Sequence, residues 1–393
     1  MAITTTAGIL VSLLTVFVAG KVGGELFERL RQPAVVGELL AGVLVGPAVL
    51  GLFHSNVTLQ TVSTMGVIVL MFTVGLETRA SDLLRVGRTA LLVALLGVVV
   101  PFGGGLLFAA AFGFSHPEAL FIGAALVATS VGVTARVLAD RGLLSTRLAK
   151  IVLAAAVIDD ILGMIVLSVV TGMTRGGLDV RSLAVVLVEV GAFIAFELFV
   201  APWLVRRHGH YLERLRIANA PLVVAIIVML GMGAAAEAIG LAGIVGAFFA
   251  GMMFAETSER WKLDRSTRPL YVWLVPYFFV VAGSQVDLAV LSRPSVVLPG
   301  LLLVAIALVT KVVGCGIGAL GEGPRGALAI GVAMVPRGEV GLIVASVGLA
   351  SHVISPAVYG MVVLVVAVST LVVPPLLPRL FAWSSSETGE RNA

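Results

Sequence analysis

Long apolar segments alternate with short polar ones along the whole chain. A run of about 20 apolar residues is long enough to cross a bilayer as an α-helix. The pattern predicts about thirteen such spans, with charged residues, Gly and Pro at the connections between them. The expected spans cover residues 6–27, 34–51, 59–77, 88–112, 119–140, 148–172, 181–205, 217–238, 241–257, 268–284, 296–319, 325–350 and 356–380.

Two of these spans contain residues that disfavour a continuous helix. The fifth is interrupted at residues 128–134 (ATSVGVT), and the twelfth at residues 335–339 (VPRGE). Irregular backbone at membrane depth is tolerated only where protein, water or an ion satisfies its polar groups. Interrupted spans at corresponding positions of two halves are the sequence feature that points most directly to a transport site at the midplane.

A weak internal repeat supports the idea of two halves. Residues 35–42 (VVGELLAG) resemble residues 244–251 (IVGAFFAG), and residues 72–75 (FTVG) resemble residues 280–283 (VVAG). An odd number of spans separates the copies, so the second copy would lie upside down in the membrane. Inverted repeats of this kind are typical of secondary transporters. Chance similarity between Gly/Ala/Val-rich segments is the alternative.

The composition agrees with a polytopic all-α membrane protein. Hydrophobic residues make up 59% of the chain and charged residues only 12%, whereas soluble domains contain about 25% charged residues. The single cysteine, Cys315, falls inside a span, which excludes an intrachain disulfide and a cysteine metal site.

The basic residues predict the orientation and argue against nucleic-acid binding. If the N-terminus lies outside, nearly all Lys and Arg fall in segments on the cytoplasmic side, as the positive-inside rule requires. Only Arg175, Arg181 and Arg293 fall on the other side, while Lys311 and Arg337 lie within spans. An odd number of spans then places the C-terminus in the cytoplasm.

Two adjacent carboxylates, Asp159 and Asp160, occupy the middle of the sixth span. One Asp at the centre of a bilayer costs roughly 2.5–3.5 kcal/mol, so intramembrane charges are usually functional and paired. Lys311 is the only lysine deep inside an apolar span and is the predicted partner.

These side chains suggest an ion site. Carboxylate oxygens are hard ligands that suit an alkali cation such as Na⁺, and the oxygens of Thr129 and Ser130 could complete its coordination. One Asp can exchange a proton while Lys311 keeps the other ionised. A purely structural polar cluster is the alternative.

The remaining intramembrane charges have a less specific interpretation. Arg337 and Glu339 lie two residues apart on the broken span and are expected to support the site, either as a structural pair or beside the ion. We assign Glu38, Glu189, Glu197 and Glu237 to packing or interfaces. All five histidines fall in predicted loops, and no phosphate-binding loop, catalytic triad or cofactor motif is present, so neither an enzyme nor a cofactor is predicted.

Four motifs together resemble the bacterial NapA-type sodium/proton antiporters, part of the cation:proton antiporter group that also holds the Kef potassium systems. They are residues 155–163 (AAVIDDILG), residues 128–138 (ATSVGVTARVL), Lys311 in its span, and residues 336–344 (PRGEVGLIV). The resemblance covers essentially the whole chain. The Kef branch is less similar, because it carries a neutral residue where Asp159 stands and a soluble nucleotide-binding tail that we do not expect here.

The resemblance implies a thirteen-helix fold with two crossed discontinuous helices, elevator-type alternating access and a homodimer in the lipid bilayer. Asp160 would bind the cation, and Asp159 would pair with Lys311. The expected domain organisation is an interface domain (1–87 and 211–290), a core ion-translocation domain (88–175 and 291–393) and a linker helix (176–210).

The sequence therefore predicts an electrogenic antiporter of a bacterial inner membrane that exchanges Na⁺ or Li⁺ for H⁺. A K⁺/H⁺ antiporter of the same fold remains an alternative, because these oxygen ligands alone do not fix ion size. A passive cation channel is a remote alternative. An intramembrane aspartyl protease is another, but it would need its two Asp on separate helices and would leave Lys311 without a role.

Overall fold

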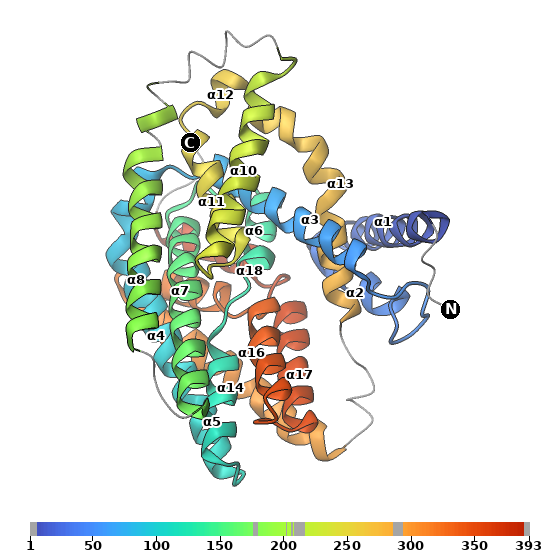
Figure 1. Cartoon of the computed structure of the whole chain (residues 1–393), viewed down its shortest axis with the longest axis vertical. Helices are drawn as coiled ribbons and strands as arrows, with labels where there is room; N and C mark the ends of the chain where they lie inside the picture. Colours follow the sequence, from blue (N-terminus) through green and yellow to red (C-terminus); the bar gives the residue numbers. More distant parts are fainter. Residues whose placement is uncertain are drawn as a thin grey trace.

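A computed structural model describes residues 6–175, 180–201, 203–205, 207, 217–285 and 294–388, and all secondary structure in these ranges is helical (Figure 1). Part of the predicted linker and Arg293 lie outside the described residues. The elements are α1 (Thr6–Arg29), α2 (Ala34–Val45), α3 (Val57–Leu76), α4 (Ala80–Ala111), α5 (His116–Val127), α6 (Val131–Asp140), α7 (Arg147–Arg175), α8 (Val180–Ala195), η1 (Phe196–Val200), α10 (Ala220–Ala238), α11 (Gly243–Phe254), α12 (Ser258–Trp261), α13 (Leu263–Ser284), α14 (Pro294–Gly318), η3 (Leu320–Glu322), α15 (Gly323–Ala333), α16 (Glu339–Ala350), α17 (Pro356–Val372) and α18 (Leu377–Thr388).

Seven helical segments of the described chain are long and apolar enough to cross a membrane. Three further apolar helices are shorter, namely α2, α11 and residues 340–350 of α16. The predicted spans at 34–51 and 241–257 are thus wrong in extent, because each helix has only 12 residues. Pro33 precedes α2 and Gly46 follows it, which limits the helix at both ends.

Three other predicted boundaries are also wrong. The predicted span 356–380 is two helices, α17 and α18, which meet at a bend of 54°, and Pro374-Pro375 lies at the break. Helix α4 begins at Ala80 rather than 88, and α13 begins at Leu263 rather than 268. Polar first turns extend these helices beyond their apolar segments, where hydropathy gives no signal.

The helices pack in two groups. In the first, α1, α2, α3, α10, α11 and α13 pack against one another. Gly42 of α2 and Gly283 of α13 each lie against the backbone of the partner helix, and Gly75 of α3 and Gly251 of α11 do the same. A side chain at any of these four positions would overlap a carbonyl group, so glycine permits the close approach.

The second group contains the broken helices. Here α4 packs against α5, α7 and α14, and α16 packs against α5 and α17. Figure 1 shows α16 and α17 side by side in this group. Ser115 and Glu118 form a capping box at the start of α5, with Pro117 in its first turn, so the helix start is defined locally.

The two helix breaks contact each other directly. Helix α5 ends at Val127 and α6 begins at Val131, while α15 ends at Ala333 and α16 begins at Glu339. The backbone N–H of Ser130 donates to the Pro336 carbonyl at 2.7 Å. This bond satisfies, inside the protein, polar backbone groups that the helix breaks leave without a helical partner.

Candidate functional site

Asp159 and Lys311 form a fully buried ion pair between α7 and α14. The Lys311 Nζ lies 3.0 Å from the Asp159 Oδ1. It also donates to the carbonyl oxygens of Gly97 and Val127, both at 2.8 Å. All three ammonium hydrogens therefore have acceptors, which a buried charge requires.

The second carboxylate oxygen of Asp159 has a different environment. Asp159 Oδ2 is buried and has no hydrogen-bond partner among the described residues. A buried acceptor without a partner is costly in an apolar interior. This oxygen is available to a ligand that reaches the site.

Arg337 lies at the break between α15 and α16 and is 1% exposed. Its Nη1 donates to the carbonyl of Ala128 at 2.8 Å and to that of Val127 at 3.4 Å. The guanidinium thus supplies positive charge at the carbonyl end of α5, where the helix dipole favours it. The side chain of Glu339 lies outside the described residues, so its pairing with Arg337 stays a prediction.

Thr129 and Ser130 stand at the break between α5 and α6. The Thr129 hydroxyl donates to the Met334 carbonyl at 3.2 Å, so it satisfies the end of α15. Thr134, on the first turn of α6, makes the same kind of bond to Ala333 at 2.7 Å. The Ser130 side chain lines a large cavity instead.

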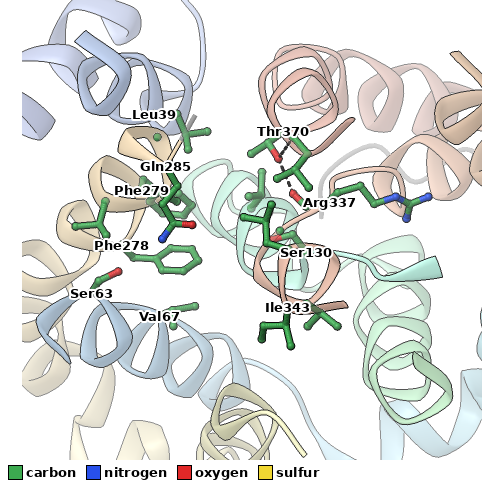
Figure 2. Close-up of a pocket in the computed structure, with 18 of the residues that line it drawn as sticks. Leu39, Ser63, Val67, Ser130, Phe278, Phe279, Gln285, Arg337, Ile343 and Thr370 are labelled. Atoms are coloured by element: carbon green, nitrogen blue, oxygen red, sulfur yellow. Dashed lines mark hydrogen bonds between the residues drawn. The ribbon is translucent and has the colours of Figure 1, made fainter. Parts of the chain in front are cut away.

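The cavity has a volume of about 810 Å³ and lies between the two helix groups. Figure 2 shows Phe278, Phe279 and Gln285 on one wall and Ser130 and Thr370 on the other. Ser55 and Gln60 line it at the α2–α3 loop and the start of α3, so it opens on that side of the molecule, the cavity side. The guanidinium of Arg337 points away from the cavity.

Asp160 is only 7% exposed and does not line this cavity. It borders a separate small space of about 10 Å³, whose other walls are apolar. These walls come from α3, α6, α7 and α11, which brings both helix groups to this carboxylate. The space is lined by Met71, Val131, Leu153, Val157, Ile244, Val245 and Phe248.

A second cluster of charges, the charged bridge, joins the two helix groups at the opposite side of the molecule. It consists of Glu38 on α2, Arg136 and Asp140 on α6, and Tyr271 on α13. Arg136 Nη2 lies 3.6 Å from Glu38 Oε1, and its Nε lies 2.7 Å from Asp140 Oδ2. The Tyr271 hydroxyl donates to Asp140 Oδ1 at 3.1 Å, and its ring lies 4.8 Å from the Arg136 guanidinium.

The profile of the transmembrane sodium/hydrogen exchanger family matches residues 10–383. The chain belongs to this family. It is a family of transmembrane antiporters and not of enzymes, in agreement with the sequence prediction.

Curated relatives cover nearly the whole exchanger. A high-affinity Na⁺/H⁺ antiporter, NhaS3 of Synechocystis, is 35% identical over 97% of this chain and 91% of its own. The Na⁺/H⁺-K⁺ antiporter GerN of Bacillus cereus is 35% identical over 93% of this chain and 94% of its own. A Na⁺/H⁺ antiporter of Enterococcus hirae is 34% identical over 93% of this chain and 96% of its own.

The fold of the exchanger is similar to a solved antiporter structure. MjNhaP1, the sodium proton antiporter of Methanocaldococcus jannaschii, superimposes with a TM-score of 0.75 at 20% identity, over 99% of this chain and 100% of that one. At this identity the likeness establishes the fold alone.

The charged bridge is the part of the exchanger that sequence reasoning missed. Arg136 was expected in a cytoplasmic segment, but it is buried, with an exposure of 7%. Glu38 was assigned to packing or interfaces, and it is buried as well, with an exposure of 2%. A signal was present, because two opposite charges near the ends of apolar helices can meet. The other packing assignments divide: Glu197 is buried, Glu189 is exposed, and Glu237 is exposed and lines the cavity.

Proposed function

We propose that this exchanger is an electrogenic Na⁺(Li⁺)/H⁺ antiporter of a bacterial inner membrane, in which Asp160 binds the cation or a proton and Asp159–Lys311 is a coupled ion pair. The observation that carries the proposal is the buried pair of Asp159 and Lys311, 3.0 Å apart and next in sequence to Asp160. Buried charges of this kind mark ion pathways and proton relays.

The proposed cation site uses carboxylate oxygens from α7 and oxygens from the break before α6. Asp159 Oδ2 has no hydrogen-bond partner among the described residues, so it can accept a cation without losing a bond. Ser130 lies at the wall of the cavity and adds a further oxygen. Thr129 helps to hold the two breaks together while its oxygen retains a lone pair for a ligand.

Coupling follows from the charges on three side chains. With a proton on Asp160 and with Asp159⁻ paired to Lys311⁺, the site is neutral. With Na⁺ bound, both carboxylates are ionised and Lys311 has released its proton, so the site carries one negative charge. One cycle therefore exchanges two protons for one Na⁺ and moves one net charge, worth about 2.3 kcal/mol per 100 mV.

We further propose elevator-type movement of a core domain (88–175 and 291–393) against an interface domain (1–87 and 211–290), with 176–210 as linker. The close helix contacts at these glycines support inverted repeats in the interface domain. Gly42 corresponds to Gly251 and Gly75 to Gly283 in the repeat, so exchange of the two copies converts one close helix contact into the other. We also propose that the chain crosses the membrane thirteen times and that its two broken helices cross each other.

The cavity and the charged bridge support alternating access. The cavity separates the two helix groups on one side, while Arg136 and Glu38 join them on the other. In the predicted orientation, with the N-terminus outside and the C-terminus in the cytoplasm, this is an outward-open state. The exposed apolar face of α1, including Leu10 and Leu14 at 61% and 62% exposure, is available to lipid or to the second subunit of the proposed homodimer.

A K⁺/H⁺ antiporter is the second candidate, and the relative GerN, named as a Na⁺/H⁺-K⁺ antiporter, favours it. The deciding experiment uses proteoliposomes that contain a pH-sensitive dye under an imposed proton gradient. Addition of Na⁺ or Li⁺ should dissipate the gradient, and K⁺ should have a much smaller effect. A response to K⁺ equal to that of Na⁺ would favour the alternative, and no response to any cation would refute antiport.

A further inference from the structure

The cavity and the small space beside Asp160 share one lining residue, Ile244 of α11. Their other described lining residues differ. The two volumes, about 810 Å³ and about 10 Å³, both border this residue. Ile244 is only 9% exposed, and it is the residue at which the two linings meet.

The residues along α3 show, independently of α11, that the cavity is followed by the space beside Asp160. Ser63, Val67 and Met71 are spaced four residues apart and so follow one face of this helix. Ser63 and Val67 line the cavity, whereas Met71 lines the space beside Asp160. The same change occurs along α11, because Gly243 lines the cavity and Phe248 lines the space. The two helices thus place the floor of the cavity at the level of Ile244.

The space beside Asp160 is too small for a hydrated cation. A volume of about 10 Å³ accommodates about one water molecule. The surrounding side chains of α3, α6, α7 and α11 are apolar and cannot replace a hydration shell. A cation that comes from the cavity must therefore displace Ile244 to reach the carboxylate with room for its ligands.

We propose that Ile244 is a gate residue, whose side chain controls the access of cations and protons from the cavity to Asp160. A β-branched side chain on a helix occupies one χ1 rotamer about 90% of the time. Rotation of this side chain is therefore restricted, and the gate opens when α11 and α7 move apart. This inference rests on the proposed role of Asp160. Ile244 itself lies on the route from the cavity to Asp160 and is not part of the proposed ion site.

Chemical labelling of a cysteine at position 160 tests the gate without any transport. The parent protein is the full chain with Asp160→Cys and Cys315→Ala, purified in detergent and treated with a small cationic methanethiosulfonate. Adding Ile244→Ala should raise the labelling rate at least about tenfold, because the restricted branched side chain no longer stands between the cavity and the thiol. Ile244→Val, which keeps the branched Cβ and removes one methyl group, should give an intermediate rate.

Val245 supplies the matched control. It is the next residue of α11 and lines the space beside Asp160, but it does not line the cavity. Val245→Ala enlarges the space without opening it, so the labelling rate should remain that of the parent. An equal acceleration by Val245→Ala and Ile244→Ala would overturn the proposal, as would no acceleration by either.

Native Cys315 reports general loosening of the structure. It is 0% exposed and lines neither volume. In the chain that keeps Asp160 and Cys315, Ile244→Ala should leave the labelling of Cys315 as slow as in the wild type; faster labelling there would mean that the variant unfolds locally and would contradict a gate. The dye assay on the wild type distinguishes failure of the gate from failure of the proposed function. If the wild type exchanges ions but Ile244→Ala leaves the labelling rate of position 160 unchanged, only the gate is refuted. If the wild type shows no exchange, only the transport function is refuted.

Discussion

Lys311 Nζ on α14 lies 3.0 Å from Asp159 Oδ1 on α7, and neither side chain is exposed to solvent. The same ammonium group donates to Gly97 on α4 and to Val127 at the end of α5. One side chain thus connects four helices of the second group, α4, α5, α7 and α14.

The first prediction is that Asp159→Ala destabilises the protein. Removing one partner of a buried ion pair leaves an uncompensated charge and costs about 3–5 kcal/mol. If Lys311 loses its proton, the uncompensated charge disappears and the cost falls. The variant should therefore be destabilised most at low pH, where Lys311 stays protonated. Thermal unfolding of the purified protein at pH 6 and pH 8 measures it, and identical melting temperatures for variant and wild type at both values would contradict the pair.

The second prediction concerns Asp160. Asp160→Asn removes the ligand charge and the titrating group but keeps the shape of the side chain. We expect no Na⁺-dependent proton movement in the dye assay, with the elution volume and melting temperature of the wild type. Robust Na⁺-driven exchange by this variant would remove Asp160 from the mechanism.

The third prediction concerns the charged bridge. Glu38→Gln weakens the contact with Arg136 at 3.6 Å and so destabilises the cavity-open state relative to its alternative. A change of about 1.4 kcal/mol in the free-energy difference between the two states changes the ratio of their populations about tenfold. The KM for Na⁺ on the cavity side should therefore rise, and the KM on the opposite side should fall.

A matched control separates the bridge from general damage. Glu25 pairs with Arg29 on exposed α1 at 2.7 Å, with both side chains more than half exposed. Such exposed pairs contribute little, so Glu25→Gln should leave both KM values unchanged. A rise of KM on both sides in Glu38→Gln would point to damage of the ion site instead.

Lys311 could be paired from the sequence, and Arg136 could not. Lys311 lies in the middle of an apolar span, where an isolated charge is costly, and the adjacent carboxylates in the middle of the sixth span offered a partner at similar depth. Arg136 lies near the end of its helix, where a charge can reach water at little cost. Its partner is on another helix, and hydropathy carries no information about which helix faces meet.

The helix breaks show the same limit. Pro336 and Gly338 disfavour helix through local chemistry, so the interruption of the twelfth span was predictable. The bond from Ser130 to Pro336 joins residues more than two hundred positions apart and depends on how the two breaks pack. Pro374-Pro375 carried an equally local signal for the α17–α18 bend. The residues around them are apolar, so hydropathy predicted one continuous span instead.

The last prediction separates charge movement from exchange, through the double variant Asp159→Asn with Lys311→Gln. Replacing both charges of the pair leaves no uncompensated ion, so the double variant should be more stable than Asp159→Ala. With a proton on Asp160 its site is neutral, and with Asp160⁻ and Na⁺ it is also neutral. Exchange should then continue at one proton per Na⁺ without net charge transfer.

Charge displacement on a solid-supported membrane measures this effect, with the dye assay on the same preparation as the control for activity. The wild type should give a sustained current on a Na⁺ jump, and the double variant should give exchange with no steady-state current. In the proposed cycle Asp160 carries the first proton and Lys311 carries the second, and no further group changes charge between the two states. An actively exchanging double variant with wild-type charge transfer per Na⁺ would assign that proton to another residue, and Arg337, whose Nε and Nη2 have no hydrogen-bond partner among the described residues, would then be the next to replace.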